Sequence, residues 1–322
     1  MSEPPTVPPR APFTTFLDLP LHTDLDTFDA HVAILGLPYG DPYTIDEVTN
    51  DQTNAPTAVR RASSRLSMHL DRYDFDFGGP LLDGRAIRVV DCGDVSGDAR
   101  DLAAHYRKAE AAARKILDAG ALLVSIGGDH GVPIPVFRAC ERHGPVTLVH
   151  VDAHLDWRDE KNGVREGYSN PIRRASELPW FDRIVQIGIR AQGSARQREY
   201  DDAVAWGADI ITSYEVLEHG MQPVLDRIPD GGTYYLSIDA DGVDPTVMPA
   251  VNAPAPGGLL YHHVRDLIHG VVRKGRVLGM DIVEITPARD LNEITSIVAG
   301  RFILNLIGTA VRAGYFDHTP QT

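Results

Sequence analysis

The segment VTLVHVDAHLD, residues 146–156, decides the fold, because an apolar run of strand length passes directly into acidic residues and histidine. Three further segments also pass from an apolar run to acidic residues, and the first of them adds a histidine: ALLVSIGGDH at 121–130, TYYLSIDADGVDP at 233–245 and RVLGMDIVE at 276–284. Runs that are apolar on both faces are typical of parallel strands covered by helices. We therefore expect a buried parallel sheet with polar side chains at the carboxyl ends of its strands.

Strand and helix patterns alternate along the chain, which predicts an α/β fold. The strand candidates are 31–37, 86–91, 121–126, 146–152, 184–189, 208–212, 233–239 and 276–284. The helix candidates are 55–67, 100–118, 131–142, 194–206, 215–228, 262–274 and 293–312. A closed barrel and an open three-layer sheet both fit this count. We expect a proline-rich arm over residues 1–13 and one domain over 14–322.

Composition excludes several classes of protein. The net charge of -14, from 45 acidic and 31 basic residues, disfavours nucleic acid as a partner. Only two cysteines occur, Cys92 and Cys140, and they predict buried thiols rather than a disulfide framework or a cysteine zinc site. The sequence contains no run of 18 apolar residues, so it predicts no membrane span, and the N-terminus lacks the apolar core of a signal peptide. We expect a cytoplasmic protein with no membrane partner.

The spacing of the polar residues indicates a metal centre. Residues i and i+2 of an extended chain point to the same side, so Asp152 projects with His154, and Asp239 with Asp241. Four carboxylates in one small volume cannot all stay ionised without compensation, and two divalent cations would neutralise them. Mixed imidazole and carboxylate ligands suit Mn, Fe, Co, Ni or Zn. The candidate ligands are His130, Asp152, His154, Asp156, Asp239 and Asp241.

Other histidines fit ordinary packing. His150 lies within an apolar run, and we interpret it as a satisfied core residue. We interpret the histidines of one predicted helix, His262, His263 and His269, as surface or packing residues.

Four motifs resemble the ureohydrolase family, the arginases and agmatinases, and its agmatinase-like branch most of all. They are GGDH at 127–130, DAHLD at 152–156, SIDADGVDP at 237–245 and DIVEITP at 281–287. The resemblance runs from about residue 32 to the final helix. It implies an open, mainly parallel eight-stranded sheet with helices on both faces, in place of a barrel. It also implies an oligomer, a homotrimer or a homohexamer.

The resemblance further implies a site and a reaction. One metal would be held by His130, Asp152, Asp156 and Asp239, and the other by His154, Asp152, Asp239 and Asp241, with Mn or Ni as occupant. A hydroxide formed from a shared water would attack the guanidinium carbon, and Asp156 would orient it and pass its proton to the leaving amine. Glu284 would pair with the guanidinium cation. The expected activity is that of a metal-dependent amidinohydrolase, which cleaves a C–N bond in a linear amidine and releases urea.

Two segments depart from the family pattern. In residues 157–175, Tyr168 stands where many relatives have histidine, and the loop lacks the pattern with which arginases hold the amino-acid end of arginine. We expect Trp157, Tyr168 and Asn170 to contact the substrate. Residues 43–63 replace a shorter glycine-rich turn. The mouth residues expected from that segment are Tyr43, Asp46, Glu47 and Asn50.

The loop residues fit several guanidino substrates. Aromatic rings and carboxylates suit guanidine, an alkylguanidine or a biguanide such as metformin. Arg158, Lys161 and Arg165 suit a guanidino acid equally well, and agmatine also fits. Amide hydrolysis, as in metal-dependent deacetylases, is a rival activity, but those enzymes lack the complete second-metal set. A catalytic or noncatalytic subunit of a hetero-oligomeric guanidine or biguanide hydrolase is a further alternative.

Overall fold

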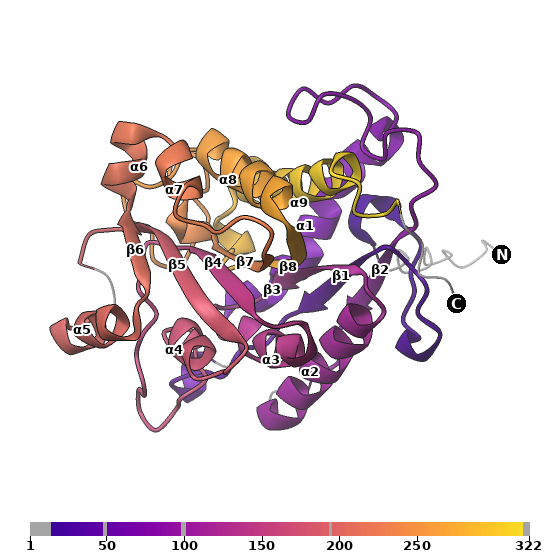
Figure 1. Ribbon diagram of the computed structural model, residues 1–322. Coiled ribbons are helices and arrows are strands. Elements are labelled where there is room, and N and C mark those ends of the chain that lie inside the picture. Colours follow the sequence, from indigo (N-terminus) through magenta and orange to yellow (C-terminus); the bar gives the residue numbers. More distant parts are fainter. Residues whose placement is uncertain (1–13, 48–49, 98–100, 193–194, 318–322) are drawn as a thin grey trace.

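The sheet is open and entirely parallel, which excludes the barrel and confirms the arginase-like architecture. The computed structural model describes residues 14–47, 50–97, 101–192 and 195–317, so the predicted arm over 1–13 lies outside the described residues (Figure 1). The strand order is β2-β1-β3-β8-β7-β4-β5-β6. The strands are β1 (Val32–Leu37), β2 (Val89–Asp94), β3 (Leu122–Gly127), β4 (Val146–Val151), β5 (Phe181–Ile189), β6 (Asp209–Thr212), β7 (Thr233–Asp239) and β8 (Arg276–Val283).

All eight predicted strands are present, but β2 begins three residues later than the predicted 86–91. Val89 pairs with Val32 at the start of β1, which fixes the register of the two strands. The residue before it, Arg88, donates its backbone N–H to His31 Nδ1 at 3.0 Å. The apolar residues Ala86 and Ile87 therefore belong to a loop that leads into the strand.

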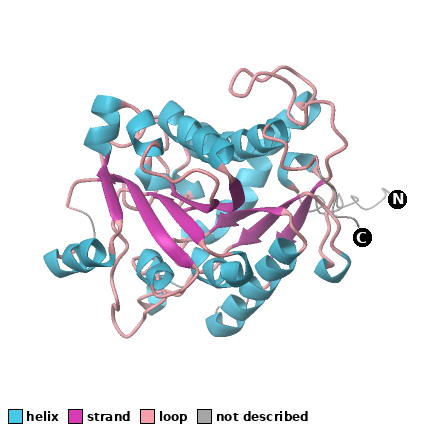
Figure 2. Ribbon diagram, viewed as in Figure 1, coloured by secondary structure: helices cyan, strands magenta, loops and turns pink. Residues whose placement is uncertain are grey.

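Helices cover both faces of the sheet, as the three-layer prediction requires (Figure 2). One face is covered by α1 (Ala55–Ser63), α6 (Ser213–His219), α7 (Gln222–Leu225), α8 (Tyr261–Lys274) and α9 (Ile294–Arg312). The other face is covered by α2 (Leu102–Asp118), α3 (Pro133–Ala139), α4 (Pro171–Ser176) and α5 (Gln197–Trp206).

Side chains of one strand alternate between the two layers. In β1, Val32 and Ile34 belong to the core under α1, α8 and α9, whereas Ala33 and Leu35 belong to the core under α2 and α3. This is the period-two alternation of an extended chain. With both faces closed by apolar contacts, polar chemistry is left to the edge where the strands end.

Three helix predictions needed correction. The predicted helix 215–228 is two helices, because Gly220 adopts a positive φ of 76° and ends α6. The predicted helices 55–67 and 131–142 end as α-helices at Ser63 and Ala139 and continue as 3-10 turns. Helix α4 was not predicted. It begins at Pro171, whose missing N–H costs nothing at a helix start.

The predicted packing residues are placed as expected. Cys92 and Cys140 are buried thiols, and burial raises the pKa of Cys92 to about 12. His263 and His269 are buried, and His269 Nε2 lies 2.7 Å from Asn305 Oδ1.

The C-terminal helix is a core element. Among the described residues, Leu291–Arg312 is the one helical region long and apolar enough to cross a membrane by composition. In the structure 83% of its most apolar window is buried, and α9 packs against α1 and α8. Its apolar character is therefore accounted for by the core.

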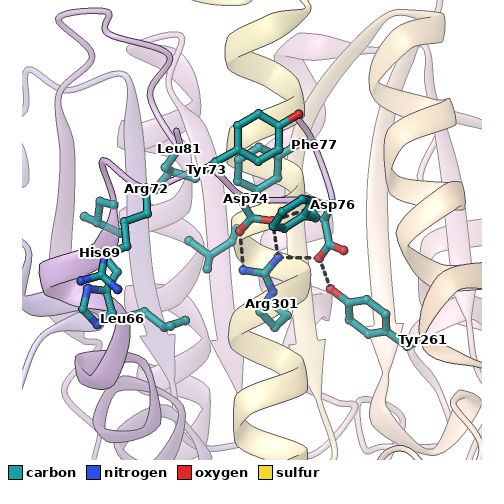
Figure 3. A pocket seen from close by; sticks show the side chains of 13 residues that line it. Leu66, His69, Arg72, Tyr73, Asp74, Asp76, Phe77, Leu81, Tyr261 and Arg301 are labelled. Atoms are coloured by element: carbon teal, nitrogen blue, oxygen red, sulfur yellow. Dashed lines mark hydrogen bonds and ion pairs between the residues drawn. The ribbon is translucent and has the colours of Figure 1, made fainter. Parts of the chain in front are cut away.

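The connection between α1 and β2 is tied to this helical layer by a polar cluster (Figure 3). Arg301 of α9 donates to both carboxylate oxygens of Asp74, at 2.6 and 2.8 Å. The hydroxyl of Tyr261 donates to Asp76, which Arg301 also contacts. A cavity of about 500 Å³ opens beside these groups. The ion pairs hold the connection against α8 and α9.

A buried ion pair anchors α1 to β2. The side chain of Arg60 is fully buried, and its Nε and Nη2 lie 2.8 and 3.0 Å from the two carboxylate oxygens of Asp91. Arg60 also donates to the carbonyl of Gly93 at 3.1 Å. Two parallel hydrogen bonds between a guanidinium group and a carboxylate offset the free-energy cost of removing both charges from water.

Arg60→Met should lower the free energy of unfolding by about 3–5 kcal/mol, because Asp91 is left buried without its partner. Arg61→Met is the matched control, since the Arg61 side chain is 63% exposed and its pair with Glu293 lies at the surface. Such a pair contributes about 1 kcal/mol or less. Urea denaturation of the two variants measures the difference, and equal midpoints would contradict the anchoring role.

Candidate metal centre

The order of the strands brings the four polar segments together. Strands β3, β8, β7 and β4 are consecutive neighbours in the sheet. Their carboxyl ends therefore meet at one edge, where ligand sites of open α/β sheets form. This edge carries His130 after β3, Glu284 after β8, Asp239 and Asp241 at the end of β7, and Asp152, His154 and Asp156 after β4.

A first group of donor atoms surrounds His130. Its Nδ1 lies 3.1 Å from Asp152 Oδ2, 3.2 Å from Asp156 Oδ2 and 3.0 Å from Asp239 Oδ2. All four side chains are buried. These are the four residues predicted to hold one of the two metals.

A second group surrounds His154. Its Nδ1 lies 3.4 Å from Asp152 Oδ1 and 3.2 Å from Asp241 Oδ2. Asp152 thus presents one oxygen to each group, which is the arrangement of a bridging ligand. The second predicted bridge, Asp239, presents one oxygen to His130, and its other oxygen accepts the backbone N–H of Asp241 at 2.7 Å.

These residues fit two divalent cations. Ligand atoms about 2.0–2.2 Å from one cation lie about 3.0–3.5 Å from one another in octahedral or tetrahedral geometry, and the donor distances fall in that range. Within the described residues, His130 Nδ1 and Asp152 Oδ2 are buried and have no hydrogen-bond partner. Imidazole nitrogen with carboxylate oxygen is the donor chemistry of first-row divalent metals.

The protonation state of His130 supports the same conclusion. Its Nε2 lies 3.2 Å from Ser237 Oγ, and Ser237 in turn donates to Asp281 Oδ1 at 2.8 Å. This chain assigns the proton to Nε2 and directs the Nδ1 lone pair toward three carboxylates. Burial lowers the pKa of His130, but those carboxylates outweigh it and hold the pKa well above its usual value. A cation, whether a proton or a metal, belongs at this point.

The carboxylates of the site also favour a bound cation. Burial, together with the charges of Asp241 and Asp152, raises the pKa of Asp239 well above its usual value. Burial and the charge of Asp152 raise the pKa of Asp241 to about 6. Burial opposes the ionisation of Asp152, but its contacts with His130, His150 and His154 outweigh burial and hold its pKa well below its usual value. A metal cation would therefore compete with protons held by Asp239 and Asp241, and it would find Asp152 already ionised.

His150 has a larger role than the sequence interpretation assigned to it. It is buried in the core, but its Nε2 lies 3.0 Å from Asp152 Oδ2 and its Nδ1 lies 3.2 Å from Gln186 Nε2. His130, His150 and Asp152 form a further set of atoms close enough to share an ion. The signal was present in the sequence, because His150, Asp152 and His154 alternate at i, i+2 and i+4 and so project to one side.

Two residues of the site hold the backbone in the left-handed region. Asp156 has a φ of 48° and Glu284 a φ of 65°, conformations that cost energy for residues other than glycine. Glu284 is then fixed by two donors: His130 N donates to its Oε1 at 2.9 Å, and Gln52 Nε2 donates to its Oε2 at 3.0 Å. Burial and the charge of Asp129 raise the pKa of Glu284 to about 8. Gln52 was not predicted.

A cavity of about 190 Å³ opens over the donor groups. Its polar floor includes Asp156, His154 and Glu284. Of the mouth residues expected from 43–63, Glu47 and Asn50 line it, whereas Tyr43 supports the loop behind and Asp46 is absent from the lining. The complete lining is Glu47, Asn50, Gln52, His154, Asp156, Tyr168, Ser169, Asp239, Asp241, Asn252, Ala253 and Glu284.

Two predicted substrate contacts lie elsewhere. Trp157 is 2% exposed and packs edge-on against Trp206 in the core beneath α4 and α5. The amide of Asn170 is used by protein groups of both loops, because its Oδ1 accepts from the Tyr43 hydroxyl at 2.7 Å and its Nδ2 donates to the Arg158 carbonyl at 2.7 Å. Neither residue lines the cavity, so their packing does not support a substrate contact. Tyr168 does line it.

An open parallel sheet with two histidine–carboxylate donor groups at its carboxyl edge is the architecture of a binuclear-metal α/β hydrolase. The model of the arginase family matches residues 30–308, and the chain belongs to this family. It is similar to the guanidinopropionase of Pseudomonas aeruginosa, with 33% identity over 317 residues, 94% of this chain and 92% of that protein. It is also similar to the agmatinase of Citrobacter koseri, with 32% identity over 305 residues and 91% of each chain.

A solved structure shows the same fold. Proclavaminate amidino hydrolase from Streptomyces clavuligerus aligns with a TM-score of 0.78 and 29% identity, over 94% of this chain and 98% of that one. The predicted resemblance is thereby confirmed. The protein is an agmatinase-like ureohydrolase of guanidino compounds with the histidine and aspartate groups of a binuclear metal site.

Removing Asp152 should disturb both donor groups, whereas removing His154 should disturb only one. After loading with Mn²⁺ and gel filtration, we expect Asp152→Ala to retain well under about one equivalent of metal and His154→Ala to retain about one. Elemental analysis measures the metal, and circular dichroism checks that both variants are folded. Two equivalents retained by folded Asp152→Ala would contradict the bridging assignment.

Proposed function

We propose that this protein hydrolyses a small, positively charged guanidino compound and releases urea together with an amine or ammonia. The observation that carries the proposal is the pair of donor groups joined by Asp152 beneath a cavity that also contains Glu284. The relatives named above, a guanidinopropionase and an agmatinase, support the same reaction class.

The metal ligands are assigned as the family resemblance implies, and the donor distances around His130 and His154 support this assignment. His130, Asp152, Asp156 and Asp239 would hold one cation, and His154, Asp152, Asp239 and Asp241 the other. When bound, two divalent cations lower the pKa of a water enough to provide hydroxide near neutral pH. The donor set accepts both Mn and Ni, and we propose one of these as the occupant.

Glu284 is proposed to bind the guanidinium group. Its carboxylate lines the cavity, and the bonds from His130 N and Gln52 fix its orientation. Each carboxylate oxygen can accept more than one hydrogen bond, so a guanidinium ion can still pair with it through two parallel bonds. The positive charge would also favour the ionised form of Glu284, opposing the effect of burial on its pKa.

Asp156 is proposed to orient the attacking water and to pass its proton to the leaving amine. It is the one ligand of the first group that follows β4 in a left-handed conformation and also lines the cavity. Its oxygen therefore faces both the metal donors and the space for substrate. Tyr168, in the position where many relatives have histidine, is a hydrogen-bonding residue in this scheme, because burial and the charge of Glu47 raise its pKa.

Urea release by purified protein tests the proposal. Protein loaded separately with Mn²⁺ and Ni²⁺ should release urea from at least one of agmatine, guanidinobutyrate, guanidinopropionate, guanidine, dimethylguanidine and metformin, and the metal that supports faster turnover identifies the occupant. Absence of urea with both metals bound would contradict a self-sufficient enzyme. Urea that appears only after a partner chain is added would favour the hetero-oligomeric alternative.

The assignment of Glu284 makes a separate prediction. Glu284→Gln keeps the size of the side chain and removes its charge, so we expect two bound metals and a loss of kcat/KM of about a hundredfold or more. Metal content and urea release are measured on the same preparation. Loss of metal from this variant would show that Glu284 supports the metal ligands instead of the substrate.

We also propose that the protein acts in the cytoplasm and, on the family resemblance, that it forms a homotrimer or homohexamer.

A further inference from the structure

We propose that Glu47 selects substrates that carry a second positive charge beyond the guanidinium group, and that the cavity rejects guanidino acids. This inference rests on the proposed function, because it assigns the part of the same cavity that receives the rest of the substrate. It separates two substrate classes that the relatives leave equally open, since agmatine ends in an ammonium ion and guanidinopropionate in a carboxylate.

The carboxylate of Glu47 is held at the cavity by the loops on both sides of the mouth. The backbone N–H of Tyr43 donates to Glu47 Oε2 at 2.9 Å, and the hydroxyl of Tyr168 donates to Oε1 at 3.4 Å. Both Glu47 and Tyr168 line the cavity. Two fixed donors give the side chain a defined position from which to meet a substrate.

The carboxylate of Glu47 makes no direct ion pair in the described part of the chain, and Lys161 reaches it only through the Tyr168 hydroxyl. No lysine or arginine nitrogen there lies within ion-pair distance of its carboxylate, whereas Arg165 pairs with Asp159 at 2.8 Å. A carboxylate fixed beside a cavity without a counter-ion attracts a cationic ligand more strongly than one already paired.

The basic residues that favoured a guanidino acid at the sequence level are engaged with other protein groups. Arg165 is engaged with Asp159, and Arg158 Nε lies 3.6 Å from Glu199. The Nζ of Lys161 donates to the Tyr168 hydroxyl at 3.2 Å and lies 4.4 Å from the centre of the Tyr43 ring. None of the three lines the cavity. A carboxylate tail would therefore meet the carboxylate of Glu47, with no lysine or arginine among the residues that line the cavity to receive it.

Charge balance within the cavity leads to the same substrate class. Two divalent cations would neutralise the four aspartates of the metal centre, and the guanidinium group would neutralise Glu284. Among the residues that line the cavity, Glu47 is then the one carboxylate left unbalanced. A terminal ammonium balances it, whereas a terminal carboxylate adds a like charge in a small space that screens charges poorly.

The test compares agmatine with 4-guanidinobutyrate, which share the guanidino group and a similar chain but end in opposite charges. We expect Mn-loaded wild-type protein to prefer agmatine in kcat/KM by at least about tenfold. Glu47→Gln retains an oxygen for the Tyr43 N–H and removes the charge. It should raise KM for agmatine about tenfold, change kcat little and leave metal content unchanged.

Glu218→Gln is the matched control, because it removes one negative charge from an exposed position on α6. It should leave the preference for agmatine intact. A preference of wild-type protein for 4-guanidinobutyrate would overturn the inference, and so would a preference for agmatine that survives Glu47→Gln.

Binding separates this inference from the proposed function. If metal-loaded protein releases no urea from any guanidino compound, the proposed function fails, and calorimetry still tests Glu47. Agmatine that binds more tightly than 4-guanidinobutyrate to wild-type protein, and equally to Glu47→Gln, supports the selection. Equal binding of the two compounds to wild-type protein overturns it.

Discussion

Repulsion among four buried aspartates is the constraint on which the rest of this structure depends. Asp152, Asp156, Asp239 and Asp241 meet at the centre of the sheet edge because β4 and β7 are neighbours. Buried carboxylates at such short separations repel one another unless cations lie between them. Two imidazoles placed among them form a preformed set of donors. The fold thus concentrates negative charge that divalent cations would neutralise, and the proposed hydrolysis depends on the cations that this charge attracts.

The surroundings of the donor groups keep them in place. Ser237 and Asp281 fix the ring of His130 from one side, and His150 approaches Asp152 from another. The strained backbone at Asp156 and Glu284 is tolerated because the strands that precede both residues are locked between two helical layers. Outer contacts of this kind set the tautomer and direction of metal ligands, so the site extends well beyond the residues that would touch metal.

Residues on strands were more predictable than residues on loops. Period-two alternation fixes the side on which a strand residue projects, so the apolar runs predicted all eight strands and placed Asp152 with His154. Loop residues have no such period. Asn170 bonds to Tyr43, 127 positions away, and Gln52 bonds to Glu284, 232 positions away, and no local pattern specifies either contact. Tertiary packing likewise places Trp157 in the core, although its aromatic side chain had suggested a residue of the cavity wall.

The cavity has a floor made of strand ends. Its mouth is made of residues 43–47 and 50–52 from one loop and residues 157–170 from another, which meet through Tyr43, Tyr168 and Glu47. The floor is rigid because it belongs to the sheet, whereas the mouth is joined by a few polar contacts. Substitutions in the loops can therefore reshape the opening without moving the metal ligands. For descendants of one ancestral enzyme, this separation makes new substrates accessible in small evolutionary steps, with the hydrolytic machinery inherited intact.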